Sequence, residues 1–438
     1  MASTVSTSGL KFGIVADDNT GASDAAGMLT GQGVRTALVL STEYLEGAEN
    51  LLEGFDALVL GTQIRSVAPE IAREKTGVSI DRLVELGVGK VQLKYCSTFD
   101  STPEGNIGPS LDAGLDALGR QITTVTPALP LNGRTTYNGY HFVNGLLLSE
   151  SPLRDHPLNP MSDSNLVRWL RQQTDRKVDL LRLDDIRRGA GHARDVLKVL
   201  ADSGVSYVVT DAVCEQDLAV TAMATEDWPF ISGGSGITAE VARLLFPGRK
   251  GLSFDDRIAG LRPGMLVVSG SMSPATLAQK TFALENGFEG LPVDPRRALD
   301  GTLDISRLVA GVSELLAAGA AVIVYSDADS FRDVRRTQEY GATLGLSVTE
   351  VGDRIAGSLA EIAGKLLDTD LIGRLVISGG ETSGAVCDGV GFDILEVGLP
   401  VEPGVPYCFP MSHPDLMAVL KSGNFGGRDF YLTVMNCE

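Results

Sequence analysis

Short apolar runs alternate along the chain with longer stretches in which apolar residues recur at helical spacing. The runs predict β-strands and the amphipathic stretches predict helices. The expected strands are 11–15, 35–40, 57–60, 91–95, 121–126, 205–210, 265–269, 321–325, 375–378 and 394–397. The expected helices are 22–32, 68–86, 164–174, 190–202, 238–245, 274–286, 305–318 and 331–344. Strands that alternate with helices indicate an α/β fold with mainly parallel sheets.

One stretch, 246–264, is rich in glycine, proline and charge, and a new strand follows it. It predicts a boundary between an N-terminal domain, 1–255, and a C-terminal domain, 256–438. Each domain is expected to carry a mainly parallel sheet flanked by helices, with a ligand cleft between the two. Inside the first domain, the proline-rich stretch 127–160 predicts a long irregular segment.

Composition and charge exclude several classes of protein. With 37 basic and 56 acidic residues the net charge is −19, so neither nucleic acid nor an anionic membrane is expected as a partner. The five cysteines are widely separated and form no C-x-x-C, which argues against a disulfide framework or a zinc site. The first residues, MASTVSTSG, do not resemble a signal peptide. No apolar run reaches the ~18 residues of a membrane helix. We therefore expect a soluble, cytoplasmic protein.

The first predicted strand runs into the sequence VADDNTGASDAAG, where Asp17 and Asp18 stand between a strand and a helix. Ligands of open α/β sheets bind at this carboxyl end. The two carboxylates could grip substrate hydroxyls or accept a proton, or they could form an acidic turn that caps the helix. Thr20 or Ser23 is another candidate for the cap, and Gly21 is expected to permit a tight turn.

Further polar residues follow the next predicted strands. Arg65 comes just after the strand 57–60, and Lys94 opens a dense polar group at the end of the strand 91–95. The other members of this group are Ser97, Thr98, Asp100, Ser101 and Asn106. Arg65 and Lys94 would supply positive charge suited to a carboxylate ligand. Ordinary surface charge at loop tips is the alternative explanation.

Three turns rich in glycine and serine follow strands in the second half of the chain. They are GSMSPAT after the strand 265–269, GGETSGAV at 379–386, and LKSGNFGG at 420–427. The N–H groups of such turns can approach phosphate oxygens closely, and helix N-termini add a positive partial charge. Three of them in one domain indicate a nucleotide or phosphoester site. The chain contains no P-loop, dinucleotide-binding or G-x-S-x-G motif.

Six short motifs occur in the order typical of the four-carbon acid sugar kinase family, which was long known only as a domain of unknown function. The chain resembles this family over nearly its whole length. The motifs are VADDNTGASD, PALPLNGRTTYNGYHFVNG, TDAVCEQDL, ISGGSGITAEVA, SGGETSGAV, and PGVP followed by LKSGNFGGRDF.

The resemblance implies an ATP-dependent kinase, assisted by Mg²⁺, that phosphorylates the terminal hydroxyl of a small sugar acid. Family substrates are threonate, erythronate, 3-oxo-tetronate and 3-oxo-isoapionate. The resemblance also implies that the N-terminal domain holds the acid and the C-terminal domain the nucleotide. Asp17 or Asp18 would be catalytic, and substrate contacts would come from Asp18, Arg65, Lys94, Ser97, Thr98, Asp100 and Ser101. Nucleotide contacts would come from Ser269, Ser271, Gly379, Gly380, Glu381, Thr382, Ser383, Gly423, Asn424 and Gly426.

One motif departs from the family pattern. Many relatives carry K-x-D-S-T-x-R-G-N, whereas the matching stretch here is KYCSTFDSTPEGN, with Glu104 in place of the arginine. This change predicts that the chain belongs to a divergent branch of the family and that its substrate is an unusual or branched acid. Two other functions stay open: a nicotinamide-dependent oxidoreductase of sugar acids and a non-enzymatic sugar-acid sensor. The residues leave the metal ligands open, and also whether the chain forms a homo-oligomer.

Overall fold

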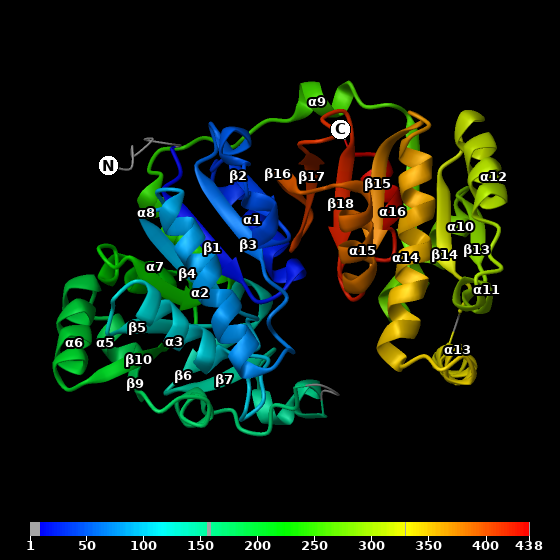
Figure 1. Cartoon of the computed structure of the whole chain (residues 1–438). Coiled ribbons are helices and arrows are strands. Elements are labelled where there is room, and N and C mark those ends of the chain that lie inside the picture. The colour runs from blue at the N-terminus through cyan, green and yellow to red at the C-terminus, as the bar shows by residue number, and fades with distance from the viewer. Residues whose placement is uncertain (1–8, 156–158, 329, 438) are drawn as a thin grey trace. The chain divides into compact units, whose positions relative to one another are not determined.

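The computed structural model describes residues 9–155, 159–328 and 330–437 and is shown in Figure 1. The chain divides into two compact units, Met1–Leu252 and Ser253–Glu438. The polar N-terminus considered above lies largely outside the described ranges. In these ranges no helix is long and apolar enough to cross a membrane.

The first unit is built on a parallel sheet with the strand order β2-β3-β1-β4-β11-β5-β10-β9. Helices α2 and α3 pack together on one face, and α1, α8 and α7 form a row on the other (Figure 1). The strands are β1 Phe12–Ala16, β2 Thr36–Val39, β3 Ala57–Gly61, β4 Lys90–Lys94, β5 Thr123–Thr126, β9 Lys177–Leu181, β10 Val205–Thr210 and β11 Phe230–Gly233. The helices are α1 Asn19–Gly31, α2 Pro69–Glu85, α3 Ile107–Ala117, α4 Leu166–Leu170, α5 Leu183–Ile186, α6 Ala190–Asp202, α7 Glu215–Ala224 and α8 Ser235–Leu245.

The second unit has the strand order β13-β14-β12-β15-β18-β17-β16. Among the described pairings, β17 runs antiparallel to both β16 and β18, and the other strands pair in parallel. Helix α14 packs between α12 and α15, and α10 packs with α16. The strands are β12 Gly264–Ser269, β13 Glu289–Val293, β14 Val322–Ser326, β15 Ile372–Ser378, β16 Ile394–Glu402, β17 Val405–Pro410 and β18 Met417–Lys421. The helices are α9 Asp255–Ala259, α10 Pro274–Glu285, α11 Pro295–Asp300, α12 Ile305–Ala317, α13 Phe331–Thr343, α14 Val348–Leu367, α15 Gly380–Val390 and α16 Phe430–Met435.

Each sheet has a point at which the strand order reverses direction. In the first unit the chain builds β2 and β3 on one side of β1 and then places β4 on the other side. In the second unit it builds β13 and β14 on one side of β12 and then places β15 on the other. Ligands of open α/β sheets bind outside the carboxyl ends of the strands at such reversals. The expectation of a mainly parallel α/β fold is confirmed, and it directs attention to the ends of β1 and β12.

Two predictions of local structure are wrong. The stretch 127–160 is not wholly irregular, because it contains a small antiparallel sheet of β6 Arg134–Tyr137, β7 Tyr140–Val143 and β8 Leu146–Leu147. Asn138 and Gly139 close its first turn with positive φ, a conformation that both residue types tolerate. The helix expected over 164–174 shortens to α4, whose N-cap Asn165 accepts a hydrogen bond from the N–H of Arg168.

Candidate functional site

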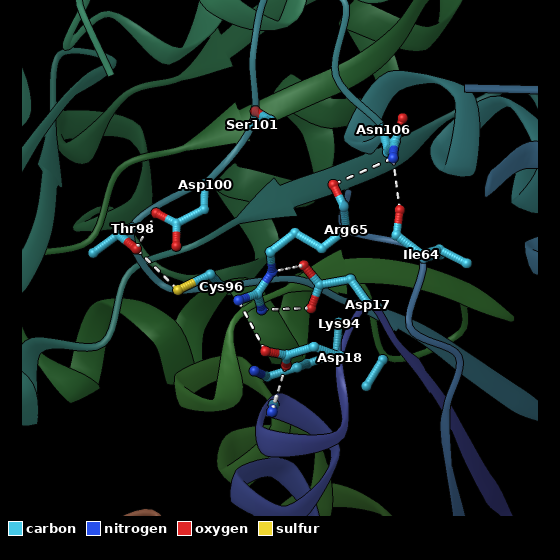
Figure 2. A network of polar contacts seen from close by, with 12 residues as sticks. Asp17, Asp18, Ile64, Arg65, Lys94, Cys96, Thr98, Asp100, Ser101 and Asn106 are labelled. Atoms are coloured by element: carbon cyan, nitrogen blue, oxygen red, sulfur yellow. Dashed lines mark hydrogen bonds and ion pairs between the residues drawn. The ribbon is translucent and has the colours of Figure 1, made fainter. Parts of the chain in front are cut away.

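Asp17 and Asp18 lie where β1 ends, at the reversal of the first sheet (Figure 2). Asp18 is the N-cap of α1, and its Oδ1 accepts a 2.6 Å hydrogen bond from the N–H of Gly21. The cap is therefore Asp18 rather than Thr20 or Ser23, and α1 starts earlier than expected. Capping does not use the whole carboxylate, because Oδ2 of Asp18 is directed toward Arg65.

The guanidinium of Arg65 lies between the two carboxylates (Figure 2). Its Nε and Nη2 donate to both oxygens of Asp17 at 2.8 and 2.9 Å, and its Nη1 is 2.9 Å from Oδ2 of Asp18. Burial alone would lower the pKa of Arg65, but the two carboxylates raise it. Burial also raises the pKa of Asp18, with Arg65 opposing and Asp17 reinforcing that shift. The single charge of Arg65 is therefore shared between two aspartates, and Arg65 would have to release at least one of them to bind a substrate carboxylate.

Lys94, at the end of β4, lies close to Asp18 and Asp24. Its side chain is buried, and its Nζ lies 3.8 Å from Oδ2 of Asp24. Gly21 makes this approach possible, since a Cβ there would lie 2.5 Å from both Lys94 Nζ and Asp18 Oδ1. We expected Gly21 to permit a tight turn, but its φ is not positive. Its missing side chain instead makes room for Lys94 beside Asp18. Within the described ranges Lys94 Nζ forms no hydrogen bond, and its ion pair with Asp24 is long.

The loop after β4 holds the other predicted substrate residues. Thr98 Oγ1 donates to Asp100 Oδ1 at 2.7 Å and lies 2.9 Å from the Sγ of Cys96. Ser97 is half-buried and lies beside Gly234 at the end of β11. Ser101 is buried in contacts of its own, because its Oγ donates to the Phe99 carbonyl and accepts from Trp169 and Gln173. Direct substrate contacts from this loop stay a prediction.

Asn106 contributes to the site in a way that the sequence did not reveal. Its Nδ2 donates to the carbonyls of Ile64, Arg65 and Val67, which fixes the loop that presents Arg65 (Figure 2). A small pocket opens beside it and is lined by Asp17, Arg65 and Asp100, among others. Glu104, in contrast, is exposed.

In the second unit the three glycine-rich turns meet at the ends of the adjacent strands β12, β15 and β18. A Cβ on Gly423 would lie 2.5 Å from Ser271 Oγ, and one on Gly379 would lie 3.4 Å from the backbone nitrogen of Ser271. The N–H of Gly379 donates to the carbonyl of Lys421 at 2.9 Å. Ser271 therefore touches both of the other turns, and the predicted nucleotide residues share one place in the fold.

Two helices begin at this meeting point. α10 starts after its N-cap Ser273, and α15 starts after Gly379, whose φ of 122° is one that glycine adopts readily. The first N–H groups of a helix have no partner within the helix and carry a positive partial charge, which suits phosphate. Gly380 is exposed, whereas Thr382 and Ser383 are buried beside it. Glu381 is exposed, and Asn424 in the third turn is exposed as well.

Ser269 does not face solvent, although the sequence suggested a nucleotide contact. It is buried, and with Ser378 it bonds the hydroxyl of Tyr431, which lies 2.9 Å from Ser378 Oγ. This network ties the ends of β12 and β15 to α16. The pKa of Tyr431 is raised to about 12 by burial, so the phenol stays protonated and can donate to either serine.

Comparison with known proteins matches both units. Residues 12–241 match a sugar-binding N-terminal domain, and residues 266–431 match a nucleotide-binding C-terminal domain. A solved structure from Haemophilus influenzae, described as DUF1537, has 34% sequence identity and a TM-score of 0.78, covering 97% of this chain and 99% of that one. The chain belongs to the DUF1537 family. The resemblance seen in the six motifs is thereby confirmed.

Curated relatives in this family carry a functional name. A protein of Methylobacterium radiotolerans named 3-oxo-tetronate kinase is 39% identical over 96% of this chain and 98% of its own length. A protein of Pseudomonas savastanoi pv. phaseolicola with the same name is 37% identical over 96% of this chain and 95% of its own.

Proposed function

We propose that this chain is an ATP-dependent kinase that phosphorylates an alcohol group of a small sugar acid, with 3-oxo-tetronate as the first candidate. The observation that carries the proposal is near-full-length similarity to relatives named 3-oxo-tetronate kinase, across both a sugar-binding and a nucleotide-binding domain. The grouping of carboxylates in one unit and glycine-rich turns in the other supports the same division of roles.

Within this proposal, Asp18 accepts the proton of the attacking hydroxyl. Its side chain is 28% exposed and that of Asp17 is 8% exposed, so Asp18 is the more accessible carboxylate. The pKa of Asp18 is raised by burial, which makes it a better base than an ordinary aspartate. Asp17 is held at both oxygens by Arg65, which suits an orienting role.

These groups account for each bond and proton in the phosphoryl transfer. The hydroxyl oxygen of the acid forms a bond to the γ-phosphorus of ATP while its proton moves to Asp18. The bond between the γ-phosphorus and the bridging oxygen breaks, and ADP leaves with that electron pair. Phosphoryl transfer depends mainly on positioning and on neutralising charge. Lys94, whose donors are not occupied by hydrogen bonds in the described ranges, is the proposed ligand of the acid's carboxylate.

Mg²⁺ is proposed as the companion of ATP, where it would neutralise phosphate charge. Mg²⁺ sites commonly use one or two carboxylates together with substrate phosphates and waters. A search of the described residues finds no group of three or more His, Cys, Asp or Glu that could hold a metal ion. We therefore expect phosphate oxygens and waters to supply most of the ligands of this Mg²⁺. Formation of a homo-oligomer stays a prediction.

The test is ADP release from MgATP with a panel of acids: both enantiomers of threonate, erythronate and 3-oxo-tetronate, and 3-oxo-isoapionate. We expect turnover with one of them, and 3-oxo-tetronate is the first to try. Because Glu104 replaces a cation with an anion, we expect the preferred acid to differ from that of relatives with arginine there.

Other outcomes point to the other functions. ATP binding without turnover of any acid in the panel would reject these substrates. A lack of ATP binding with retained acid binding would favour a sensor, and NADH binding in place of ATP would favour an oxidoreductase.

A further inference from the structure

The turn 422–427 directs carbonyl oxygens toward a buried lysine beneath it. Lys421, the last residue of β18, is 1% exposed. Its Nζ donates to the carbonyls of Ser422, Gly423 and Phe425 at 3.0, 3.3 and 3.2 Å. No carboxylate forms an ion pair with this ammonium within the described ranges, so backbone oxygens supply most of its hydrogen-bond acceptors.

A buried glutamine continues this arrangement along the rest of the turn. Gln279 of α10 is also 1% exposed. Its Nε2 lies 3.0, 2.9 and 2.9 Å from the carbonyls of Phe425, Gly426 and Gly427. Lys421 and Gln279 together therefore hold the carbonyls along nearly the whole turn toward the interior.

The direction of the carbonyls fixes the direction of the amides. In a trans peptide the C=O of one residue and the N–H of the next point in opposite directions. The N–H groups of Gly423, Asn424 and Gly426 follow carbonyls that are held inward, so they point away from the two buried side chains. Within the described ranges these three N–H groups have no hydrogen-bond acceptor.

The side chains of the turn leave these amides open. Gly423 has no Cβ beside Ser271, and Gly426 has a φ of 87°, which glycine adopts without strain. The N–H of Gly427, in contrast, is bonded to Glu402 at 2.8 Å. An outward row of unbonded amides next to two helix N-termini suits the oxygens of a phosphate chain.

We propose that Lys421 and Gln279 are positioning residues that hold the turn's carbonyls inward and thereby present the amides of Gly423, Asn424 and Gly426 to the phosphates of the nucleotide. This inference rests on the proposed kinase function. It assigns the third turn to the phosphate groups rather than to the adenosine part of ATP.

The experiment compares Lys421→Met with wild type in the full-length protein. The dissociation constants for ATP, ADP and adenosine are measured by calorimetry at pH 7. We expect ATP and ADP to bind about 10-fold more weakly, because the amides are no longer held in place, and adenosine to bind as before. The KM for ATP should rise while the KM for the acid stays unchanged.

Lys90 offers a matched control in the other unit. It is buried, its Nζ donates to the carbonyls of Thr225, Glu226 and Trp228, and burial lowers its pKa to about 8, as it does for Lys421. Lys90→Met removes the same kind of contact in the unit that does not contain the glycine-rich turns. It should lower Tm without changing the dissociation constant for ATP.

Gln279→Leu keeps the inference testable if Lys421→Met does not fold. It removes three contacts to the turn without removing a charge, and we expect a smaller loss of ATP and ADP binding in the same direction. Unchanged ATP binding in a folded variant of either residue, or an equal loss for ATP and adenosine, would overturn the inference. A wild-type protein that binds no ATP would instead overturn the proposed function, and this inference with it.

Discussion

At the scale of single residues, Asp18 caps a helix, and the proposed function adds a chemical task. One oxygen caps α1 through the N–H of Gly21, and the other faces Arg65. Asparagine caps a helix about as well as aspartate but cannot accept the proton. The two tasks can therefore be separated by one substitution.

Asp18→Asn should lower kcat by roughly 100-fold or more, the usual range for loss of a general base, and leave Tm nearly unchanged. Steady-state kinetics with MgATP and the acid found in the panel would measure this.

Thr382→Ala, at the start of α15, should mainly raise the KM for ATP. Small and equal effects of both substitutions would contradict the assignment of catalysis to one unit and of nucleotide binding to the other.

At the scale of elements, the small sheet of β6, β7 and β8 depends on buried polar contacts. Asp211 accepts from the N–H groups of Asn138 and Gly139 at its first turn, at 2.8 and 2.9 Å. His141, in β7, is fully buried and lies 3.0 Å from the hydroxyl of Thr136 through its Nδ1. Burial lowers the pKa of His141 to about 4, so the ring is neutral in the folded protein.

This neutral histidine predicts a loss of stability in mild acid. The unfolded chain binds a proton near the ordinary pKa of ~6.5, whereas the folded chain does so only near 4. Stability is therefore lost as the pH falls from 6.5 toward 4, by up to roughly 3 kcal/mol for this one group. Thermal unfolding at pH 7 and pH 4.5 should show a smaller drop in Tm for His141→Gln than for wild type. His413→Gln, in the other unit, should keep the wild-type drop, and equal drops in all three proteins would exclude His141 as the cause.

At the scale of the whole molecule, the two units share the same location for their candidate sites. Each places its candidate site at the carboxyl ends of parallel strands, where the strand order reverses. In the first unit, Arg65 and Lys94 lie among three aspartates, so the cluster keeps a net negative charge, as does the whole chain with −19. An anionic acid would therefore need direct contact with one of the two cations rather than a broad positive surface.

Hydrogen exchange on the full chain would test the division of labour between the units. ATP should slow amide exchange in the turns 270–273, 379–383 and 422–427, because their N–H groups would bind phosphate. The acid should instead slow exchange around 17–24 and 96–106. Protection of the first unit by ATP alone, with the second unit unchanged, would reverse the assignment.

The sequence alone determined the fold class and the order of most elements, because strand and helix periodicities are local properties of the chain. It missed α14, which carries Gly352, Gly357 and Gly364, residues that weaken a helix. The capping box of Ser347 and Glu350 was an available signal for its start. Packing stabilises the helix: α14 lies against α15, and Gly364 and Gly389 are part of this contact.

For the site, the sequence located the right segments but not the partners of each side chain. Asp17, Asp18, Arg65 and Lys94 are adjacent because β3, β1 and β4 are neighbours, which is a property of the sheet order. Only the tertiary structure showed that Arg65 is occupied by two aspartates and that Lys421 lies under the third glycine-rich turn. Composition and periodicity are local properties of the sequence, whereas the partner of a buried charge depends on which distant strands the fold brings together.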